Sequence, residues 1–346
     1  MPRVLYVLNT YPELSQTYIE AERQQVAERA ETLAIALREP TLKNPEHLPY
    51  QLHTWWVSQL LGRGKGKGFR IKRKARAFAP DVVHSHWIFA SDAVMRAARA
   101  CDVPWTLRTH SFDILERSDD QLAPDIRRCN ETDCAGILAF PFLRERLLRL
   151  GLKEEKLIDT PPVVDARRFD DLGPNGPGVI YTSAVRPKKG ISEYFALSNL
   201  VSERPFTFYP MALPRTQIDT LGDRYDGRVE VRQPVAHSAM LQEWKQHTWL
   251  VYPGSLSPTG IGWPISVVEA WAAGVGVCMQ RIRPDLEDYI GDCGLLFDDV
   301  AELPDILRSE PDAAMRERAH ARAMDFDIRN HMPLLYDAWA KVGVIV

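Results

Sequence analysis

The sequence has little of three features that would place a chain in a specialised class. Its 5 cysteines in 346 residues are scattered, and the one close pair, Cys129 and Cys134, has no Cys or His partners at zinc spacing. No stretch approaches the roughly 18–20 apolar residues of a membrane-spanning helix. The 43 Lys and Arg nearly balance the 46 Asp and Glu, which leaves a net charge of −3. We therefore expect free thiols in a reducing cytoplasm, no metal site, no membrane span and no general attraction to nucleic acid.

What is present is the composition of a folded protein, with 45% hydrophobic and 26% charged residues. At roughly 100–200 residues per domain, the length predicts two domains. Short apolar runs alternate with helical patterns in both halves, which is typical of parallel β-α-β units. Strands are expected over residues 4–9, 32–37, 82–86, 105–109, 136–140, 156–160, 179–184, 206–211, 229–233, 249–253, 275–280 and 294–297. Helices are expected over residues 18–29, 51–62, 70–78, 91–100, 124–130, 141–150, 191–202, 238–246, 265–273, 303–309, 313–323 and 331–342.

A run dense in Gly and Pro, residues 170–178, interrupts this pattern and cannot continue a helix or a central strand. We therefore expect one Rossmann-like domain over residues 1–170, a linker over 171–178 and a second such domain from residue 179. Open parallel sheets bind ligands at the carboxyl ends of their strands. Two doubly wound domains thus make the cleft between them the expected ligand site.

The most informative segment is residues 251–280, where a strand leads into a loop rich in Gly, Ser and Pro and then into a helix near Ile265. That order presents backbone N–H groups and a helix N-terminus to a phosphate. Glu269 lies about one turn into the helix, where a carboxylate can accept hydrogen bonds from a ribose diol. The alternative, a glutamate that merely favours the first turns of a helix, stays equally open on these grounds.

Several motifs, taken in their order along the chain, resemble a single family. Residues 269–274, Glu-Ala-Trp-Ala-Ala-Gly, are similar to the donor-binding element of the retaining glycosyltransferases of family 4. Nearly the whole chain takes part, and the opening motif resembles the polysaccharide-building branch. The other matching segments are residues 11–19, 80–87, 109–113, 151–169 and 185–190. The resemblance implies the GT-B fold, in which two doubly wound Rossmann-like domains face each other across a cleft. It also implies a second domain over 179–326 and a C-terminal helix, within 327–346, that returns to the first domain.

This resemblance assigns the donor to the second domain. Glu269 would hold the ribose of a nucleotide sugar. Arg186 and Lys189 would neutralise its diphosphate, because a leaving nucleoside diphosphate needs positive charge as its bond breaks, and Lys188 is a substitute for either. A solvated basic turn is the alternative reading of these cations. The expected donor loop comprises Gly254, Ser255, Thr259, Gly260, Ile261, Gly262 and Trp263.

The first domain would supply the catalytic histidine and the acceptor side. His110 ends a strand at the crevice edge, and the resemblance places it against the donor sugar near the reacting carbon. A buried histidine bonded to backbone is the alternative. His84 and His86 alternate on the preceding strand, and the resemblance implies a structural role for the second position, so His110 is preferred to both as the catalytic residue. The residues expected on the acceptor side are Asn9, Thr10, Tyr11, Ser15 and Thr17.

One position departs from the family pattern. The first glutamate of the family's Glu-x7-Glu should fall eight residues before Glu269, and that position is Ile261. In the family this glutamate holds a hydroxyl of the donor sugar, and isoleucine cannot accept a hydrogen bond. Either the sugar is held by other groups, such as Ser257, Thr259 or backbone N–H groups, or the activity is weakened or lost.

A basic segment, residues 62–76, holds 8 cations and no anion, in contrast to the net charge of −3 for the whole chain. Its functional interpretation is contact with an anionic membrane surface or a lipid-diphosphate acceptor, since each Lys or Arg near an anionic leaflet contributes about 1 kcal/mol. A solvated loop and helix face is the equal alternative. The patch residues are Arg63, Lys65, Lys67, Arg70, Lys72, Arg73 and Lys74.

The sequence therefore predicts a retaining, metal-independent glycosyltransferase without a cofactor, cytoplasmic and in peripheral contact with the inner face of the membrane. Its expected donor is a nucleotide sugar. Its expected acceptor is a glycan or a polyprenyl-diphosphate-linked glycan of surface polysaccharide synthesis. The rivals are a non-catalytic GT-B protein that binds a glycan, a nucleotide or a partner, supported by Ile261, and a nucleotide-sugar epimerase, which should carry acid and base carboxylates in the cleft.

Overall fold

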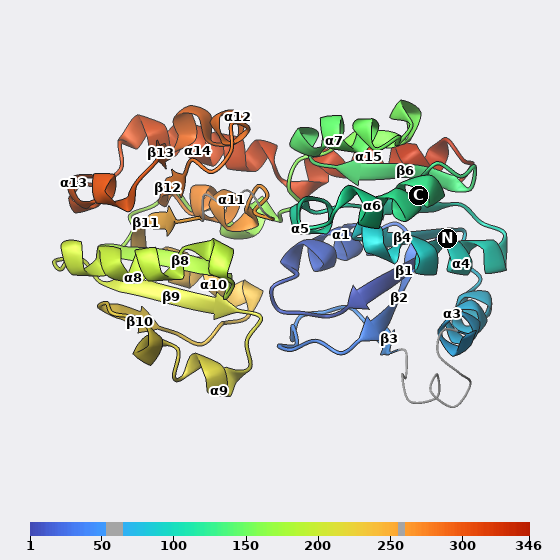
Figure 1. Cartoon of the computed structure of the whole chain (residues 1–346), viewed down its shortest axis with the longest axis horizontal. Coiled ribbons are helices and arrows are strands. Elements are labelled where there is room, and N and C mark those ends of the chain that lie inside the picture. Colours follow the sequence, from blue (N-terminus) through green and yellow to red (C-terminus); the bar gives the residue numbers. More distant parts are fainter. Residues whose placement is uncertain (53–64, 255–259) are drawn as a thin grey trace.

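The computed structural model describes residues 1–52, 65–254 and 260–346, with residues 65–70 described as helix backbone only. It contains two parallel sheets of 7 and 6 strands, each flanked by helices, in two halves of the molecule (Figure 1). This confirms the predicted α/β architecture of two doubly wound domains. Among the described helices, none has the length and apolar character needed to cross a bilayer.

The first sheet has the strand order β3-β2-β1-β4-β5-β6-β7, all parallel. Its strands are β1 (Arg3–Thr10), β2 (Glu31–Arg38), β3 (Tyr50–Leu52), β4 (Val82–His86), β5 (Trp105–Arg108), β6 (Cys134–Ala139) and β7 (Leu157–Asp159). The helices between them are α1 (Thr17–Ala27), α3 (Lys65–Phe78), α4 (Ser91–Cys101), α5 (Ser111–Leu115), α6 (Asp119–Cys129) and α7 (Arg144–Arg149). The reversal of strand order between β1 and β4 puts a crevice at the carboxyl ends of these two strands.

The second sheet has the order β10-β9-β8-β11-β12-β13. Its strands are β8 (Gly178–Ala184), β9 (Phe206–Met211), β10 (Val229–Val231), β11 (His247–Tyr252), β12 (Gly276–Gln280) and β13 (Leu295–Phe297). The following helices complete this half and the C-terminus: α8 (Ile191–Leu200), α9 (Arg215–Ile218), α10 (Met240–Trp244), α11 (Ile265–Ala272), α12 (Leu286–Ile290), α13 (Leu303–Arg308), α14 (Ala313–Asp325) and α15 (Ile328–Ala340).

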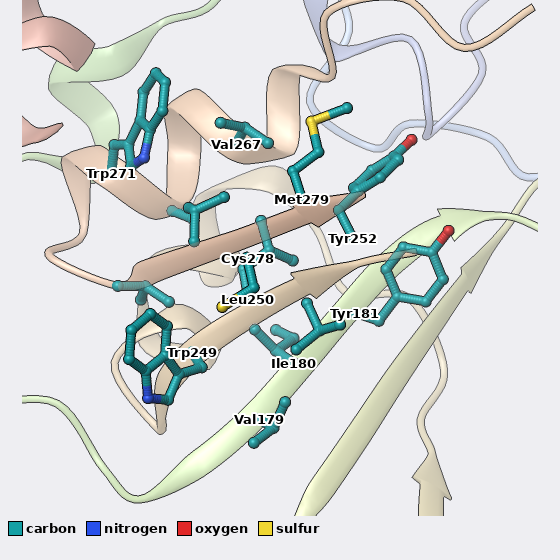
Figure 2. Packing of buried hydrophobic residues seen from close by; sticks show 14 of the residues in the cluster. Val179, Ile180, Tyr181, Trp249, Leu250, Tyr252, Val267, Trp271, Cys278 and Met279 are labelled. Carbon is teal, nitrogen blue, oxygen red and sulfur yellow. The ribbon is translucent and has the colours of Figure 1, made fainter. Parts of the chain in front are cut away.

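The central strands of the second domain are rich in apolar residues because they lie in the middle of its core. Consecutive residues of β8, β11 and β12, such as Trp249 and Leu250, are all buried, because helices cover both faces of the sheet (Figure 2). Trp271 on α11 belongs to the same cluster. At the carboxyl ends, the rings of Tyr181 and Tyr252 meet edge-on at 5.4 Å, which brings two phenols to the end of the sheet where a ligand is expected.

The last helix, α15, packs on the first domain. Its Met332, Leu335 and Trp339 lie in a buried cluster with residues of β1, as the GT-B resemblance implies. In the opposite direction, Phe169 lies in the core of the second domain. The chain thus crosses between the halves twice, and the amide of Ile328 donates to the carbonyl of Val164 at 2.8 Å where the crossings run side by side. The residue limits of the two domains stay a prediction.

One predicted helix is wrong at its first two residues. A helix was expected over residues 51–62, but Gln51 and Leu52 belong to β3, which extends the first sheet by pairing with β2. Leu52 faces Ala36 in that ladder, so the edge of the sheet takes up residues that the local pattern assigned to a helix. The rest of the expected helix lies outside the described residues. The short α5 was not expected, because five residues carry too little periodicity to identify a helix.

Candidate active site

A large cavity of about 1240 Å³ lies between the two domains. Its walls come from segments that follow the carboxyl ends of β1, β5, β8 and β11, as the two facing sheets require. Of the predicted site residues, the cavity is lined by Thr10, Ser15, Thr17, His110, Arg186, Lys189, Gly260, Gly262, Trp263 and Glu269. The cleft predicted between the domains is therefore present and brings both halves of the predicted site together.

The first wall is the start of α11. Ile265 and Ser266 line the cavity at the N-terminus of this helix, and Glu269 follows one turn later with only 6% of its surface exposed. One carboxylate oxygen of Glu269 lies 3.3 Å from Nε2 of His237, a cavity residue that the sequence did not single out. Among the described residues the other oxygen has no hydrogen-bond partner, and the carboxylate and the helix N-terminus line the same cavity.

Lys189 is a desolvated cation at the end of β8. Its ammonium contacts the hydroxyl of Tyr252 and lies 4.9 Å from the centre of that ring. Burial lowers the pKa of Lys189 to about 8. Among the described residues, no carboxylate comes within ion-pair distance of this ammonium. A half-buried cation that meets a phenol and, among the described residues, no carboxylate favours an incoming anion.

The backbone next to Lys189 is fixed by Gly190. This glycine has φ of 57°, and a Cβ added to it would stand 2.8 Å from the Cβ of Pro253. The close approach of the two segments holds Lys189 beside the end of β11, and the hydroxyl of Tyr181 donates to the Lys189 carbonyl at 2.6 Å. Arg186, three residues earlier, is exposed and lines the cavity.

Lys188 connects the two domains. Its ammonium forms an ion pair with Glu116 of the first domain and donates to the carbonyl of Gly260 at 3.0 Å. Ser111 donates to the same carbonyl at 3.2 Å. Burial lowers the pKa of Lys188, against the raising effect of Glu116. The cleft is therefore partly closed by polar contacts in this structure, and Glu116 is a site residue that sequence reasoning missed.

The donor loop is only partly a cavity wall. Gly260, Gly262 and Trp263 line it, whereas Ser255 and Thr259 lie outside the described residues. Gly254 does not line the cavity. Its amide donates to Oε1 of Gln280 at 2.9 Å. Ile261 is 2% exposed within the second-domain core. The side chain at the position of the family's glutamate thus points into the protein, because an isoleucine gains by burial.

His110 stands on the opposite wall, at the N-cap of α5. Its amide donates to Asp113 at 2.7 Å, which fixes the first turn of that helix. Its ring lies 4.4 Å from the ring of Tyr18, and its Nε2 is 3.0 Å from Nδ1 of His86. Burial lowers the pKa of His110 well below its usual value, and the neighbouring His86 and Arg108 add to this effect. His110 is therefore a neutral imidazole in the cleft at physiological pH.

Behind His110 lies a fully buried carboxylate, Glu22 of α1. Its two oxygens contact Nε2 of His84 and of His86, at 3.0 and 3.2 Å, and Nε of Arg108 at 2.7 Å. Burial alone would raise the pKa of Glu22, but Arg108 and the two histidines hold it well below its usual range. Within the described part of the chain, Glu22, His84 and His86 are also the one group whose ligand atoms are close enough together for a metal ion. The guanidinium already neutralises the carboxylate there.

Some of the residues predicted for the acceptor side lie at the cavity, whereas their role stays a prediction. Thr10, Ser15 and Thr17 line the cavity. Asn9 does not, and its amide lies 3.4 Å from the hydroxyl of Thr10.

Tyr11 is a correction to the predicted acceptor side. It is 1% exposed, and its hydroxyl accepts from Arg23 at 2.5 Å and contacts Glu20. The aromatic ring of Tyr11 gains by packing in the first-domain core, and its hydroxyl finds buried charged partners there.

The described part of the basic patch, on α3, lies apart from the cavity. Helix α3, which carries Lys72, Arg73 and Lys74, is on the side of the first domain away from the second domain (Figure 1). Arg73 is exposed, and the ammonium of Lys74 donates to the carbonyl of Leu52 at 2.8 Å. Arg63 lies outside the described residues, and so do the side chains of Lys65, Lys67 and Arg70.

Comparison with known proteins rests on structure. No protein-family model matches the sequence, and no curated protein sequence matches it either. The structure of HepE from Anabaena in complex with UDP-glucose matches with a TM-score of 0.77 and 15% identity over 99% of this chain and 100% of that one. Sucrose-phosphate synthase from Thermosynechococcus elongatus matches with a TM-score of 0.70 and 14% identity, over 98% and 99% of the two chains.

A glycosyltransferase from Rickettsia africae matches with a TM-score of 0.68 and 14% identity, over 99% of this chain and 98% of its own. These matches span both sheets and the returning C-terminal helix, because they cover almost the whole of each chain. The chain therefore has the two-domain GT-B fold of glycosyltransferases.

Proposed function

We propose that the protein is a retaining glycosyltransferase that moves a sugar from a nucleotide-sugar donor to an acceptor hydroxyl. The observation that carries this proposal is the pair formed by the desolvated Lys189 and by Glu269 at the start of α11, on one wall of the interdomain cavity. A cation without a carboxylate partner suits a diphosphate, and a buried carboxylate suits a ribose diol. The likeness in fold to HepE, which was solved with UDP-glucose, agrees with this pairing.

In the proposed complex the nucleotide lies along the second domain. Lys189 and Arg186 contact the diphosphate, together with the amide groups of Ile265 and Ser266 at the helix N-terminus. Glu269 accepts hydrogen bonds from the ribose through the oxygen that His237 leaves available. The sugar then extends toward the first domain and His110, with the amides around Gly260 and Gly262 in place of the missing glutamate.

The proposed reaction has one bond broken and one formed on the same face of the sugar. The bond from the anomeric carbon to the diphosphate oxygen breaks, and the acceptor oxygen bonds to that carbon. The acceptor proton passes to the leaving diphosphate. Catalysis then depends on positioning and on stabilising the charge that develops on the diphosphate. Lys189 and Arg186 supply that positive charge, so we propose that the transfer needs neither a metal nor a cofactor.

The acceptor would approach along the wall formed by Thr10, Ser15 and Thr17. The hydroxyls of these residues can form hydrogen bonds with the hydroxyls of a glycan. We propose a glycan or a polyprenyl-diphosphate-linked glycan of surface polysaccharide synthesis. The exposed Arg73 on α3 supports contact of the first domain with an anionic membrane, at the inner face of the cell membrane.

The experiment that tests this function starts from thermal stabilisation by a panel of nucleotide sugars. We expect one nucleotide class to raise Tm, with hydrolysis and transfer then measured by mass spectrometry using that donor. Absence of any nucleotide binding would refute the enzyme proposal.

The second candidate function is a GT-B protein that binds a nucleotide or glycan without turnover. Ile261 favours it, because its side chain is buried where the family has a glutamate on the donor sugar. Binding of a nucleotide sugar without transfer to any supplied acceptor, and without hydrolysis, would select this candidate over the first.

A further inference from the structure

We propose that Glu22 acts through His86 to hold His110 in the tautomer that is protonated at Nε2, so that His110 meets a ligand only as a hydrogen-bond acceptor at Nδ1. Glu22 and His86 are positioning residues, since neither lines the cavity. The role of His110 toward a sugar rests on the proposed function, whereas the tautomer itself does not.

Three contacts connect the buried carboxylate to the cleft. Arg108 donates from Nε to Oε2 of Glu22 at 2.7 Å. Nε2 of His86 is 3.2 Å from Oε1 of the same carboxylate, and Nδ1 of His86 is 3.0 Å from Nε2 of His110. The planes of the two imidazoles are 9° apart. Each ring nitrogen on this path therefore faces a single partner.

The directions of these hydrogen bonds follow from the chemistry of each group. An ionised carboxylate can only accept, so Nε2 of His86 carries a proton and donates to Glu22. A neutral imidazole has one N–H, which leaves Nδ1 of His86 as an acceptor and makes Nε2 of His110 the donor. Burial lowers the pKa of His86 to about 4 and that of His110 well below its usual value, so both rings are neutral. Nδ1 of His110 is then unprotonated.

A second set of contacts leads from the same carboxylate through His84 to the returning helix. The indole N–H of Trp339, on the returning helix, can only donate, and it donates to the hydroxyl of Thr106 at 2.8 Å. That hydroxyl lies 2.7 Å from Nδ1 of His84. Nε2 of His84 stands 3.0 Å from Oε1 of Glu22 but outside hydrogen-bond geometry, and a hydroxyl can both donate and accept, so this branch does not fix the tautomer of His84. The assignment for His110 therefore rests on the path through His86.

The position of His110 gives the tautomer a consequence for the ligand. His110 is the N-cap of α5 and lines the cavity, and among the described residues its side chain makes no capping hydrogen bond to that helix. A ligand hydroxyl that reaches the ring meets an acceptor and not a proton donor. His110 therefore cannot act as a general acid through Nδ1. We infer that the site favours sugars with a free hydroxyl at this point over their deoxy analogues.

The test is a long-range proton–nitrogen correlation spectrum of the full-length protein with ¹⁵N-labelled histidine, recorded without nucleotide. The resonances of His110 are identified by their loss in His110→Gln. We expect a protonated nitrogen at Nε2 and an unprotonated one at Nδ1. Protonation at Nδ1 would overturn the proposal, whether or not the protein proves to be a transferase.

Two variants test the path. In Glu22→Gln the side-chain amide can donate to His86, so the tautomers of His86 and His110 should both invert and their nitrogen shifts should exchange. Thr106→Val, the matched control on the other branch, should leave His110 unchanged. An unaltered His110 in a folded Glu22→Gln protein would refute the relay. If that variant does not fold, the wild-type spectrum still decides the tautomer.

A metal ion on Glu22, His84 and His86 is the competing explanation of the same cluster. Elemental analysis of the purified protein measures it directly, and Zn²⁺ titration of the labelled protein shows whether the histidine resonances move. One tightly held metal ion per chain, with loss of the protonated Nε2 of His86, would overturn the proposal. The expected result is unchanged histidine spectra at stoichiometric Zn²⁺.

Discussion

The lowered pKa of Lys189 predicts that a nucleoside diphosphate binds more weakly as the pH rises from 7 to 9, although ionisation of the phosphate alone would not weaken binding. Burial lowers this pKa to about 8, against the raising effect of the Glu116 charge. The ammonium also lies near the charge of Lys188 and contacts the hydroxyl of Tyr252. If only the protonated ammonium binds a nucleoside diphosphate, Kd rises by a factor of about ten between pH 7 and pH 9. The phosphate itself is fully ionised above a pKa of about 6, so it contributes no weakening over this range.

Isothermal titration calorimetry in two buffers of different ionisation enthalpy measures both the affinity and the protons taken up. Binding should take up about half a proton at pH 8 and nearly one at pH 9, because the bound diphosphate raises the pKa of the ammonium. Lys189→Met should bind weakly and without this pH dependence, whereas Lys153→Met, on the exposed surface outside the cavity, should behave as wild type. An affinity that stays constant from pH 7 to pH 9 in wild type would refute the assignment of Lys189.

Three further predictions follow from single contacts. Glu269→Ala should weaken nucleotide binding by about 1.5–3 kcal/mol, roughly 10- to 150-fold in Kd, while Glu193→Ala on the exposed face of α8 should not; equal affinities in calorimetry would show that Glu269 does not hold the ribose. Tyr11→Phe should lower the free energy of unfolding by about 1–3 kcal/mol in urea titrations, because two buried charged groups lose a partner, and a changed acceptor KM with unchanged stability would contradict its core position. Replacing Lys72 and Arg73 by Ser should reduce binding to anionic vesicles at low salt, and unchanged partitioning would remove α3 from the membrane proposal.

The central strands were predictable because they are buried on both faces. Runs such as 179–181 and 249–253 have apolar side chains at consecutive positions, and nothing outside the strand is needed to recognise them. The edge strand β3 was not predictable in the same way, since three residues become a strand only by pairing with β2. The local pattern therefore identified the central strands and the edge strands β7, β10 and β13, and it failed at β3.

Residues of the cavity wall were predictable where they follow a strand, as His110 and Lys189 do, or begin the helix after a glycine-rich loop, as Glu269 does. Tyr11 also follows a strand, but its side chain is buried and does not face the cleft. Its position after β1 does not determine whether an aromatic side chain points to the cleft or into the core. Glu22 was missed although a signal existed. Two histidines alternate on a strand that is otherwise fully buried, and buried imidazoles at both positions need polar partners from another element.

The central claim is that the cavity between the domains holds a nucleotide sugar by its diphosphate and ribose. A crystal structure of the protein with a nucleoside diphosphate tests it most directly. The diphosphate should lie within hydrogen-bond distance of the Lys189 ammonium and the first amides of α11, with a ribose hydroxyl on Glu269. A diphosphate bound elsewhere, or in the cleft without contact to Lys189 and Glu269, would contradict the claim.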